Sequence, residues 1–205
     1  MELAVGDFVG SYRVGCLIIA TENSKVYESF HPSMCQKLAL KLIPANGPCS
    51  PQQIADEVSF LRSISHPNIM SVLDVIFDPA YTAIVMPLAT GGDLFDFVLN
   101  NGPVREQIAC QIVFSMLNCL VYLHGVGICH RDIKLENFLL MDNNYDNPNI
   151  FLIDFGYSKR FKPGELMSEY LGTKHYAAPE IHISRPCMFS RFSIMESFFL
   201  ILTHR

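Results

Sequence analysis

His130-Arg131-Asp132-Ile133-Lys134-Leu135-Glu136-Asn137 is the stretch that decides the fold, and it is followed by Asp154-Phe155-Gly156 and then by Ala178-Pro179-Glu180. Either tripeptide alone would be weak evidence, because short motifs occur by chance. The longer motif and both tripeptides in this order are not a coincidence. The three stretches are therefore interpreted together.

The side chains of these stretches suit the transfer of a phosphoryl group to a hydroxyl. Asp132 can orient an attacking alcohol and accept its proton, while Lys134 can neutralise charge that develops on the phosphoryl group. Asn137 and Asp154 carry oxygen atoms that can hold Mg²⁺ against nucleotide phosphates. In type and spacing, these residues resemble the catalytic loop and the metal-binding segment of eukaryotic protein kinases.

Composition limits the other classes of function. The chain has 205 residues, half of them hydrophobic, which is enough for one core or for two small lobes around a cleft. Lys and Arg total 15 against 20 Asp and Glu, so the formal net charge is −5. That balance provides no basic surface for nucleic acid and no polybasic patch for a membrane, so neither is expected as a partner.

Cysteine usage and the N-terminus predict a cytoplasmic or nuclear location. The seven cysteines form no C-x-x-C pair, and reduced buried thiols are the expected state. The N-terminus has no basic region followed by an apolar stretch, so a secretory signal is not predicted. The apolar run at 198–202 is far too short to span a bilayer.

The first part of the chain, from Tyr12 to Met86, is predicted to form short β-strands interrupted by one helix. Residues 37–43 alternate cleanly and place Lys41 on the face opposite the leucines. On the strand alone, a lysine that reaches solvent is the commoner case. Glu57, beside the apolar stripe of a helix predicted over 52–65, would alone be an ordinary solvated residue. Together the two resemble the strand–helix ion pair of a kinase N-lobe.

The second part of the chain is predicted to be mainly helical. Asp93 is expected to cap a short helix that ends near Asn100, and Pro103 to open a longer, buried helix that ends near residues 124–125. Short strands are predicted at 138–140 and 150–153, with a polar turn between them.

The resulting fold class is α+β, a bilobal protein-kinase-like fold with a β-rich N-lobe and a helical C-lobe that lacks its later helices. The resemblance covers residues 8–182, with an N-lobe at about 8–86, a hinge at 87–91 and a partial C-lobe at 92–182. Residues 183–205 contain no D-x-W-S-x-G segment, and the chain has no tryptophan. We therefore expect a divergent tail and a C-terminally truncated product, whether a short isoform or the result of an altered reading frame, a retained intron or an incomplete gene model.

The resemblance implies that the cofactors are ATP and Mg²⁺. Lys41 would contact the α- and β-phosphates, and Glu57 would hold Lys41 in place. The remaining nucleotide contacts would come from Val26 and Ala39 above the adenine, Leu139 below it, Met86 as gatekeeper, and the backbone of Pro87 and Ala89. A hydrophobic stack that aligns the lobes would consist of Leu61, Val72, His130 and Phe155.

The resemblance also indicates the kind of partner. Lys134, with Gly172-Thr173 further on, favours a protein substrate with a serine or threonine acceptor, in the style of the calcium/calmodulin-dependent or AMP-activated branch. Arg131 could pair with a phosphate that an upstream kinase adds to the activation segment. Ser168 is the preferred acceptor and Thr173 the second, because Thr173 is expected to be structural.

One departure concerns the phosphate-binding loop. The family pattern places glycines at positions 19, 21 and 24, where this chain has Ile19, Thr21 and Ser24. Glycines there let the backbone approach phosphates, and Glu22 adds a negative charge beside a polyanion. We therefore expect weakened nucleotide binding. The alternative function is a catalytically impaired pseudokinase, or a truncated decoy, that binds partners without phosphoryl transfer.

Overall fold

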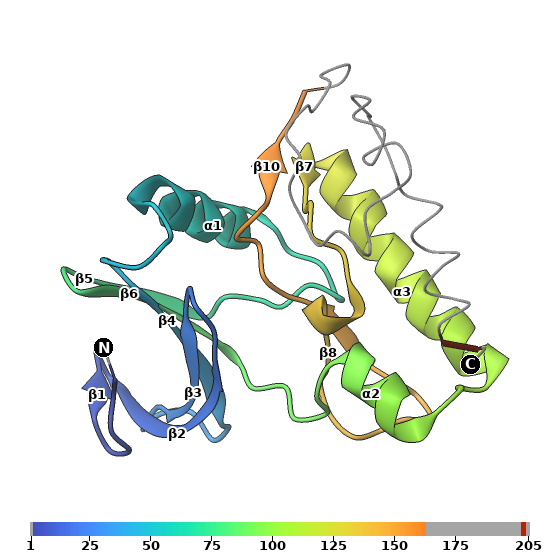
Figure 1. Ribbon diagram of the computed structural model, residues 1–205, viewed down its shortest axis with the longest axis horizontal. Helices are drawn as coiled ribbons and strands as arrows, with labels where there is room; N and C mark the ends of the chain where they lie inside the picture. The colour runs from blue at the N-terminus through green and yellow to red at the C-terminus, as the bar shows by residue number, and fades with distance from the viewer. Residues whose placement is uncertain (1, 163–201, 204–205) are drawn as a thin grey trace. The chain divides into compact units, whose positions relative to one another are not determined.

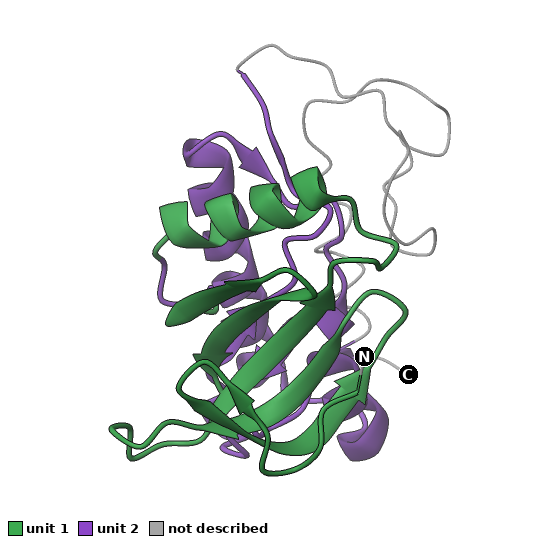
Figure 2. Cartoon of the chain, turned by 90° about the vertical axis from the view of Figure 1, so that its left-hand side faces the viewer, with its two compact units in different colours: residues 1–65, 70–89 green, residues 66–69, 90–205 purple. Residues whose placement is uncertain are grey.

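The computed structural model describes residues 2–162 and 202–203, and the chain divides into two compact units (Figure 2). Residues up to 65 together with 70–89 form the first unit. Residues 66–69 and those from 90 onward form the second. The predicted acceptors Ser168 and Thr173, the Ala-Pro-Glu motif and nearly all of the predicted tail lie outside the described residues.

The first unit is a six-stranded antiparallel sheet with one helix, α1 (Figure 1). The strand order is β1-β2-β3-β4-β6-β5, and α1 lies between β4 and β5 in the sequence. The strands are β1 (Phe8–Val9), β2 (Tyr12–Ala20), β3 (Lys25–Phe30), β4 (Leu38–Pro44), β5 (Asp74–Asp78) and β6 (Tyr81–Pro87), and α1 is Pro51–Ser63. The predicted strands with one helix are confirmed, with β1 as an additional short edge strand.

The two faces of β4 support different hydrophobic clusters, as its alternation predicts. Leu38, Leu40 and Leu42 are buried among the side chains of β2, β3 and β6. Ile43 points to the opposite face and packs with Ile54 of α1. Burying apolar surface on both sides explains why this strand is nearly continuous in hydrophobic residues.

Helix α1 begins at Pro51 because Ser50 caps its N-terminus. The hydroxyl of Ser50 accepts a hydrogen bond from the N–H of Gln53, and the Gln53 side chain accepts one from the N–H of Ser50. Pro51 occupies the first turn, where a missing N–H costs nothing. This reciprocal cap fixes the start of the helix that carries Glu57.

The second unit contains two helices, α2 (Leu94–Asn101) and α3 (Glu106–Gly125), and a 3-10 turn η1 (Leu135–Asn137). Two short antiparallel pairs of strands complete its described part: β7 (Ile128–Cys129) with β10 (Lys159–Arg160), and β8 (Phe138–Leu140) with β9 (Ile150–Leu152). The structure confirms the predicted α+β class, the two short strands and the cap, since the Asp93 carboxylate accepts from the N–H of Asp96.

The predicted start of the long helix at Pro103 is wrong. Helix α3 begins at Glu106, after Arg105, whose φ of −56° and ψ of 138° are not helical. The N–H of Val104 donates to the carbonyl of Leu202 at 2.8 Å. A proline marks the approach to this helix rather than its first residue.

Helix α3 buries one stripe, which includes Ile112, Met116 and Leu123. It is also the one helix among the described residues whose length and apolar composition would allow it to cross a membrane. That property is weak evidence, because the core helix of a soluble protein passes the same test. The one-sided burial is that of a helix packed against its own unit.

Residues 66–69 pack with the second unit although both flanking segments belong to the first. The Asn68 side chain donates to the carbonyl of Ile150 at 3.1 Å, and the N–H of Leu152 donates to the carbonyl of Asn68 at 2.9 Å. The Cys119 thiol also donates to that carbonyl, at 3.1 Å. Burial raises the pKa of Cys119 to about 12, so the thiol stays protonated and acts as a structural donor.

Candidate active site

The residues of the decisive stretch form the loop that follows β7 and then η1 itself, all in the second unit. Arg131 has a φ of +67°, a left-handed conformation that is uncommon for a non-glycine residue. Its Nε donates to the carbonyl of Tyr157 at 2.6 Å. A strained backbone held by a specific contact is typical of functional loops.

His130 holds this loop in place through contacts with Ile153 and Phe155. Its side chain is buried, and its Nε2 lies 3.0 Å from the carbonyl oxygen of Ile153, to which it donates. Its ring packs edge-on against Phe155 at 4.9 Å between centroids. Burial lowers the pKa of His130, and the Ile153 carbonyl and nearby carboxylates oppose this shift only in part. The imidazole is therefore neutral and structural.

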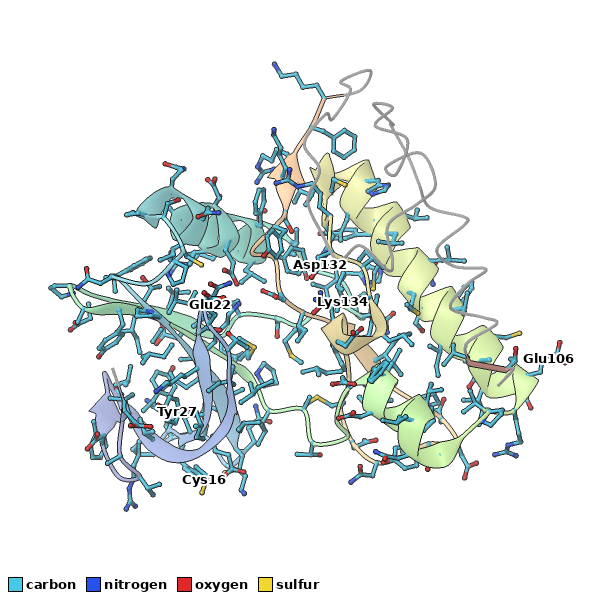
Figure 3. The ribbon with its side chains drawn as sticks, in the orientation of Figure 1. Cys16, Glu22, Tyr27, Glu106, Asp132 and Lys134 are labelled. Atoms are coloured by element: carbon cyan, nitrogen blue, oxygen red, sulfur yellow. The ribbon has the colours of Figure 1, made fainter. Side chains whose placement is uncertain are left out.

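Asp132, Lys134 and Asn137 form one hydrogen-bonded cluster, and Figure 3 labels Asp132 and Lys134. The Asp132 Oδ2 accepts from the Lys134 ammonium at 2.8 Å and from the Asn137 amide at 3.1 Å. The same amide group donates to the Asp132 carbonyl at 2.7 Å. Asp132 and Asn137 are both buried, so the carboxylate is held in one orientation.

Lys134 is kept in its cationic form. Burial alone lowers the pKa of Lys134, but the hydrogen bond and charge of Asp132, with the charges of Glu136 and Asp154, outweigh burial and raise it. The ammonium therefore stays protonated at neutral pH. A permanent cation beside a fixed carboxylate is an arrangement that can act on a phosphoryl group.

Asn137 and Asp154 are brought together by the pairing of β8 with β9. The N–H of Ile153 donates to the carbonyl of Asn137 at 2.9 Å, and Asp154 is the next residue. Asp154 has a φ of +62°, the second such non-glycine residue in the described part of the chain. Because the Asn137 amide nitrogen is bonded to Asp132, the amide oxygen is the atom suited to a cation.

This pair fits Mg²⁺. Magnesium in phosphate-binding sites is usually held by one or two side-chain oxygens, with waters and phosphates completing the shell. No group of three or more His, Cys, Asp or Glu residues gathers as a metal site within 2–162 and 202–203. Asn137 and Asp154 could therefore supply two side-chain oxygens of the kind that Mg²⁺ takes beside phosphates.

In the first unit, the predicted contact between Lys41 and Glu57 is present. The Lys41 ammonium lies 2.7 Å from Oε1 of Glu57, and the two side chains are only 16% and 7% exposed. The solvated interpretation of both residues is therefore excluded. Helix α1 directs Glu57 inward because Glu57 lies three positions from the buried Ile54 and Phe60 and so shares their face.

Strand register places several predicted nucleotide contacts on one face of the sheet. Val26 pairs with Lys41, and Ala39 pairs with Met86. Residues that pair directly across antiparallel strands point to the same face, and Ala39 and Lys41 share a face because they are two positions apart. Val26, Ala39, Lys41 and Met86 therefore project together from this surface, here called the Lys41 face.

The remaining predicted residues are divided between the two units. Pro87 ends β6 and Ala89 follows it in the first unit, whereas Leu139 lies in β8 of the second. Of the predicted stack, Leu61 and Val72 pack against the cluster around Ile43, and His130 contacts Phe155 in the other unit.

Two contributors were not found from the sequence. The carbonyl of Tyr157, which receives the Arg131 side chain, could not be recognised because any residue type supplies a carbonyl. The Thr21 hydroxyl closes the turn between β2 and β3, where the expected glycines are missing. The sequence pattern that could have predicted this turn is a threonine three positions before a serine at the end of a strand.

Comparison with known proteins gives consistent matches. The family model described as "Protein kinase domain" matches residues 20–191. Serine/threonine-protein kinase ppk25 of Schizosaccharomyces pombe is 35% identical over 196 residues, which covers 90% of this chain and 46% of that protein. Human calcium/calmodulin-dependent protein kinase type 1B is 38% identical over 150 residues, covering 73% of this chain and 43% of that protein.

A third relative is calcium-dependent protein kinase 7 of Oryza sativa subsp. japonica. It is 36% identical over 181 residues, covering 86% of this chain and 32% of that protein. The chain thus spans less than half the length of each of these relatives.

Proposed function

The chain belongs to the protein kinase family, and on this premise we propose that it transfers the γ-phosphoryl group of ATP to serine or threonine hydroxyls of proteins. The observation that carries the proposal is the cluster in which the Asp132 carboxylate is fixed by Lys134 and Asn137. A carboxylate fixed in this way is prepared to orient a hydroxyl and to accept its proton.

In the proposed reaction, the acceptor oxygen attacks the γ-phosphorus while Asp132 takes the hydroxyl proton. A new O–P bond forms, and the bond between the γ-phosphorus and the bridging oxygen breaks, which leaves ADP. Lys134, protonated throughout, offsets negative charge on the transferring group. Lys41, oriented by Glu57, would hold the α- and β-phosphates.

Magnesium, when bound through Asn137 and Asp154, would neutralise phosphate charge. The hydrogen bonds from the Asn137 amide nitrogen to Asp132 support this role, because they leave the amide oxygen of Asn137 as the atom that can face the ion. The same side chain would thus connect the metal to the proposed base.

We also propose that an upstream kinase regulates the chain by phosphorylating the activation segment. Ser168 is the preferred acceptor and Thr173 is the second choice. Arg131 is the basis, since it lies beside Asp132 and could pair with a phosphate. Unchanged turnover of Ser168→Ala, after treatment with an activating kinase, would contradict the preference for Ser168.

A second candidate function is partner binding without phosphoryl transfer. The glycine-free turn between β2 and β3 favours it, because that turn is expected to hold phosphates poorly. The fixed Asp132 cluster and the Lys41–Glu57 pair oppose it, since a chain that only binds partners needs neither.

The experiment that separates the two functions is transfer of label from γ-labelled Mg·ATP to a general protein substrate, followed by identification of the labelled amino acid. The proposal expects phosphoserine or phosphothreonine with the wild-type chain and loss of about 100-fold or more with Asp132→Asn. Equal label transfer by both would contradict the proposed role of Asp132. Label on tyrosine would contradict the proposed acceptor.

A further inference from the structure

The turn between β2 and β3, residues 21–24, is closed by its own hydrogen bonds. The N–H of Thr21 donates to the carbonyl of Ser24 at 2.8 Å. The Thr21 hydroxyl oxygen accepts from the N–H of Asn23 at 3.3 Å and from the N–H of Ser24 at 3.1 Å. The hydroxyl hydrogen is directed to the Ser24 carbonyl at 3.1 Å.

These bonds occupy the donors that a phosphate would need. Phosphate-binding loops work by presenting unpaired backbone N–H groups to the anion. Here the amides of Thr21, Asn23 and Ser24 are already used. Within the described residues, Glu22 alone of the four keeps an amide without a partner, and its side chain is an exposed carboxylate (Figure 3).

The backbone of the turn is also unlike that of an anion-binding nest. Such nests alternate right- and left-handed residues, which directs successive N–H groups to one point. None of residues 21–24 has a positive φ. The cation at the start of β3, Lys25, lies 3.7 Å from the carboxylate of Glu2.

The Lys41 face beside this turn is apolar where it meets β2. Ile19, at the position of the first expected glycine, pairs with Val26, which in turn pairs with Lys41. Ile19 therefore projects from the Lys41 face, and it is 54% exposed. An exposed β-branched side chain beside Val26 suits a flat nucleoside better than a polyanion.

From these observations we propose that the 21–24 turn does not bind the phosphates of a nucleotide, and that the Thr21 hydroxyl keeps it closed. The first unit then recognises the nucleoside through the Lys41 face, and its phosphate contact is restricted to Lys41 itself. This inference rests on the proposed use of ATP, and it names Thr21 as the residue that limits affinity for the triphosphate.

The test is a comparison of Thr21→Val with the wild-type chain in binding adenosine and Mg·ATP by calorimetry. Valine keeps the β-branched shape but frees the amides of Asn23 and Ser24. We expect Thr21→Val to bind Mg·ATP about fivefold more tightly, because amides bonded to a neutral oxygen become available to an anion. Adenosine affinity should be unchanged. Thr21→Ser, which retains the hydroxyl, should behave as wild type.

Three results would contradict either the inference about the 21–24 turn or the proposed function. Weaker or unchanged Mg·ATP binding by Thr21→Val overturns the inference, because the hydroxyl then contacts phosphate or has no effect. Amide exchange at Asn23 and Ser24 should be slow in wild type and faster in Thr21→Val, and fast exchange in wild type also overturns it. A wild-type chain that binds neither ligand overturns the proposed function instead, while amide exchange still decides whether the turn is closed.

Discussion

Lys41 and Glu57 show how a single ion pair can be required without being a source of net stability. Both side chains are largely buried, so each charge has lost most of its hydration. Their attraction at 2.7 Å offsets that loss only while both are present. The pair is therefore better explained by the position it gives the Lys41 ammonium than by folding energy.

We predict that Glu57→Ala lowers the free energy of unfolding by about 3 kcal/mol, because it removes the carboxylate from a buried ammonium. The double variant Lys41→Met/Glu57→Leu should recover most of this loss. The more exposed pair Lys37–Glu28, at 3.2 Å, is a control in the same unit. Glu28→Ala should change stability by less than about 1 kcal/mol. Urea unfolding measures all three, and equal losses at both pairs would contradict the argument.

His130 provides a pH-dependent prediction. Its pKa lies below the ordinary value of 6.5 because of burial, despite the opposing charges of Asp154 and Asp132, while Lys134 acts in the same direction as burial. Below that value the unfolded chain binds a proton that the folded chain resists, so stability falls as pH falls through about 6.5. The pKa of His66 is lowered by burial as well and adds to the trend.

Urea midpoints at pH values of about 7.5, 6.5 and 5.5 should therefore decrease in wild type. In His130→Phe, which keeps an aromatic ring against Phe155, the decrease should be smaller, even if the variant is less stable at neutral pH. A decrease of the same size in both chains would show that His130 is not buried in its neutral form.

At the scale of elements, residues 91–92, which precede α2, pack closely against the β8–β9 hairpin. The N–H of Gly91 donates to the carbonyl of Leu140 at 3.0 Å, and the N–H of Leu140 donates to the carbonyl of Gly92 at 2.8 Å. A Cβ on Gly91 would lie 2.6 Å from the Leu140 Cβ and would collide with the backbone carbonyl of Asp142. Glycine is thus required at 91 by close approach.

Gly91→Ala should accordingly cost about 2 kcal/mol in unfolding free energy, since backbone rather than a flexible side chain must move. Gly125→Ala is the matched control, because a Cβ there meets nothing within 4 Å. At the end of a helix it should leave stability roughly unchanged or slightly raised. Thermal unfolding distinguishes the two, and similar midpoints would contradict the proposed packing.

Elements with a strong pattern were predictable, and those fixed by distant contacts were not. Strand β4 follows from its alternating leucines, and the cap of α2 from Asp93, because both signals are local. The start of α3 was misplaced because the backbone stays non-helical through Arg105, in a segment whose Val104 amide bonds to Leu202, far away in the sequence. Attachment of residues 66–69 to the second unit likewise depends on Ile150 and Leu152.

At the scale of the whole molecule, the groups that the proposed reaction needs are divided between two units. The first supplies Lys41 with Glu57, and the second supplies the Asp132 cluster with Asp154. The Asp132 cluster and Asp154 could be predicted from the spacing of their motifs. Lys41 and Glu57 could be predicted only as a pair, because neither residue alone indicates a function. The closed turn at Thr21 was not foreseen, because the absence of glycine predicts a poor phosphate loop but not which atoms close it.

The most direct test of the proposed chemistry is the rate at which the full chain transfers label from γ-labelled Mg·ATP to a serine- or threonine-containing substrate, compared between Asp132→Asn and Asp142→Asn. Both variants replace one carboxylate of the second unit by an amide, but Asp142 is exposed in the turn between β8 and β9. We predict that Asp132→Asn lowers the rate about 100-fold or more and that Asp142→Asn leaves it nearly unchanged. Equal rates for the wild-type chain and Asp132→Asn would contradict the account.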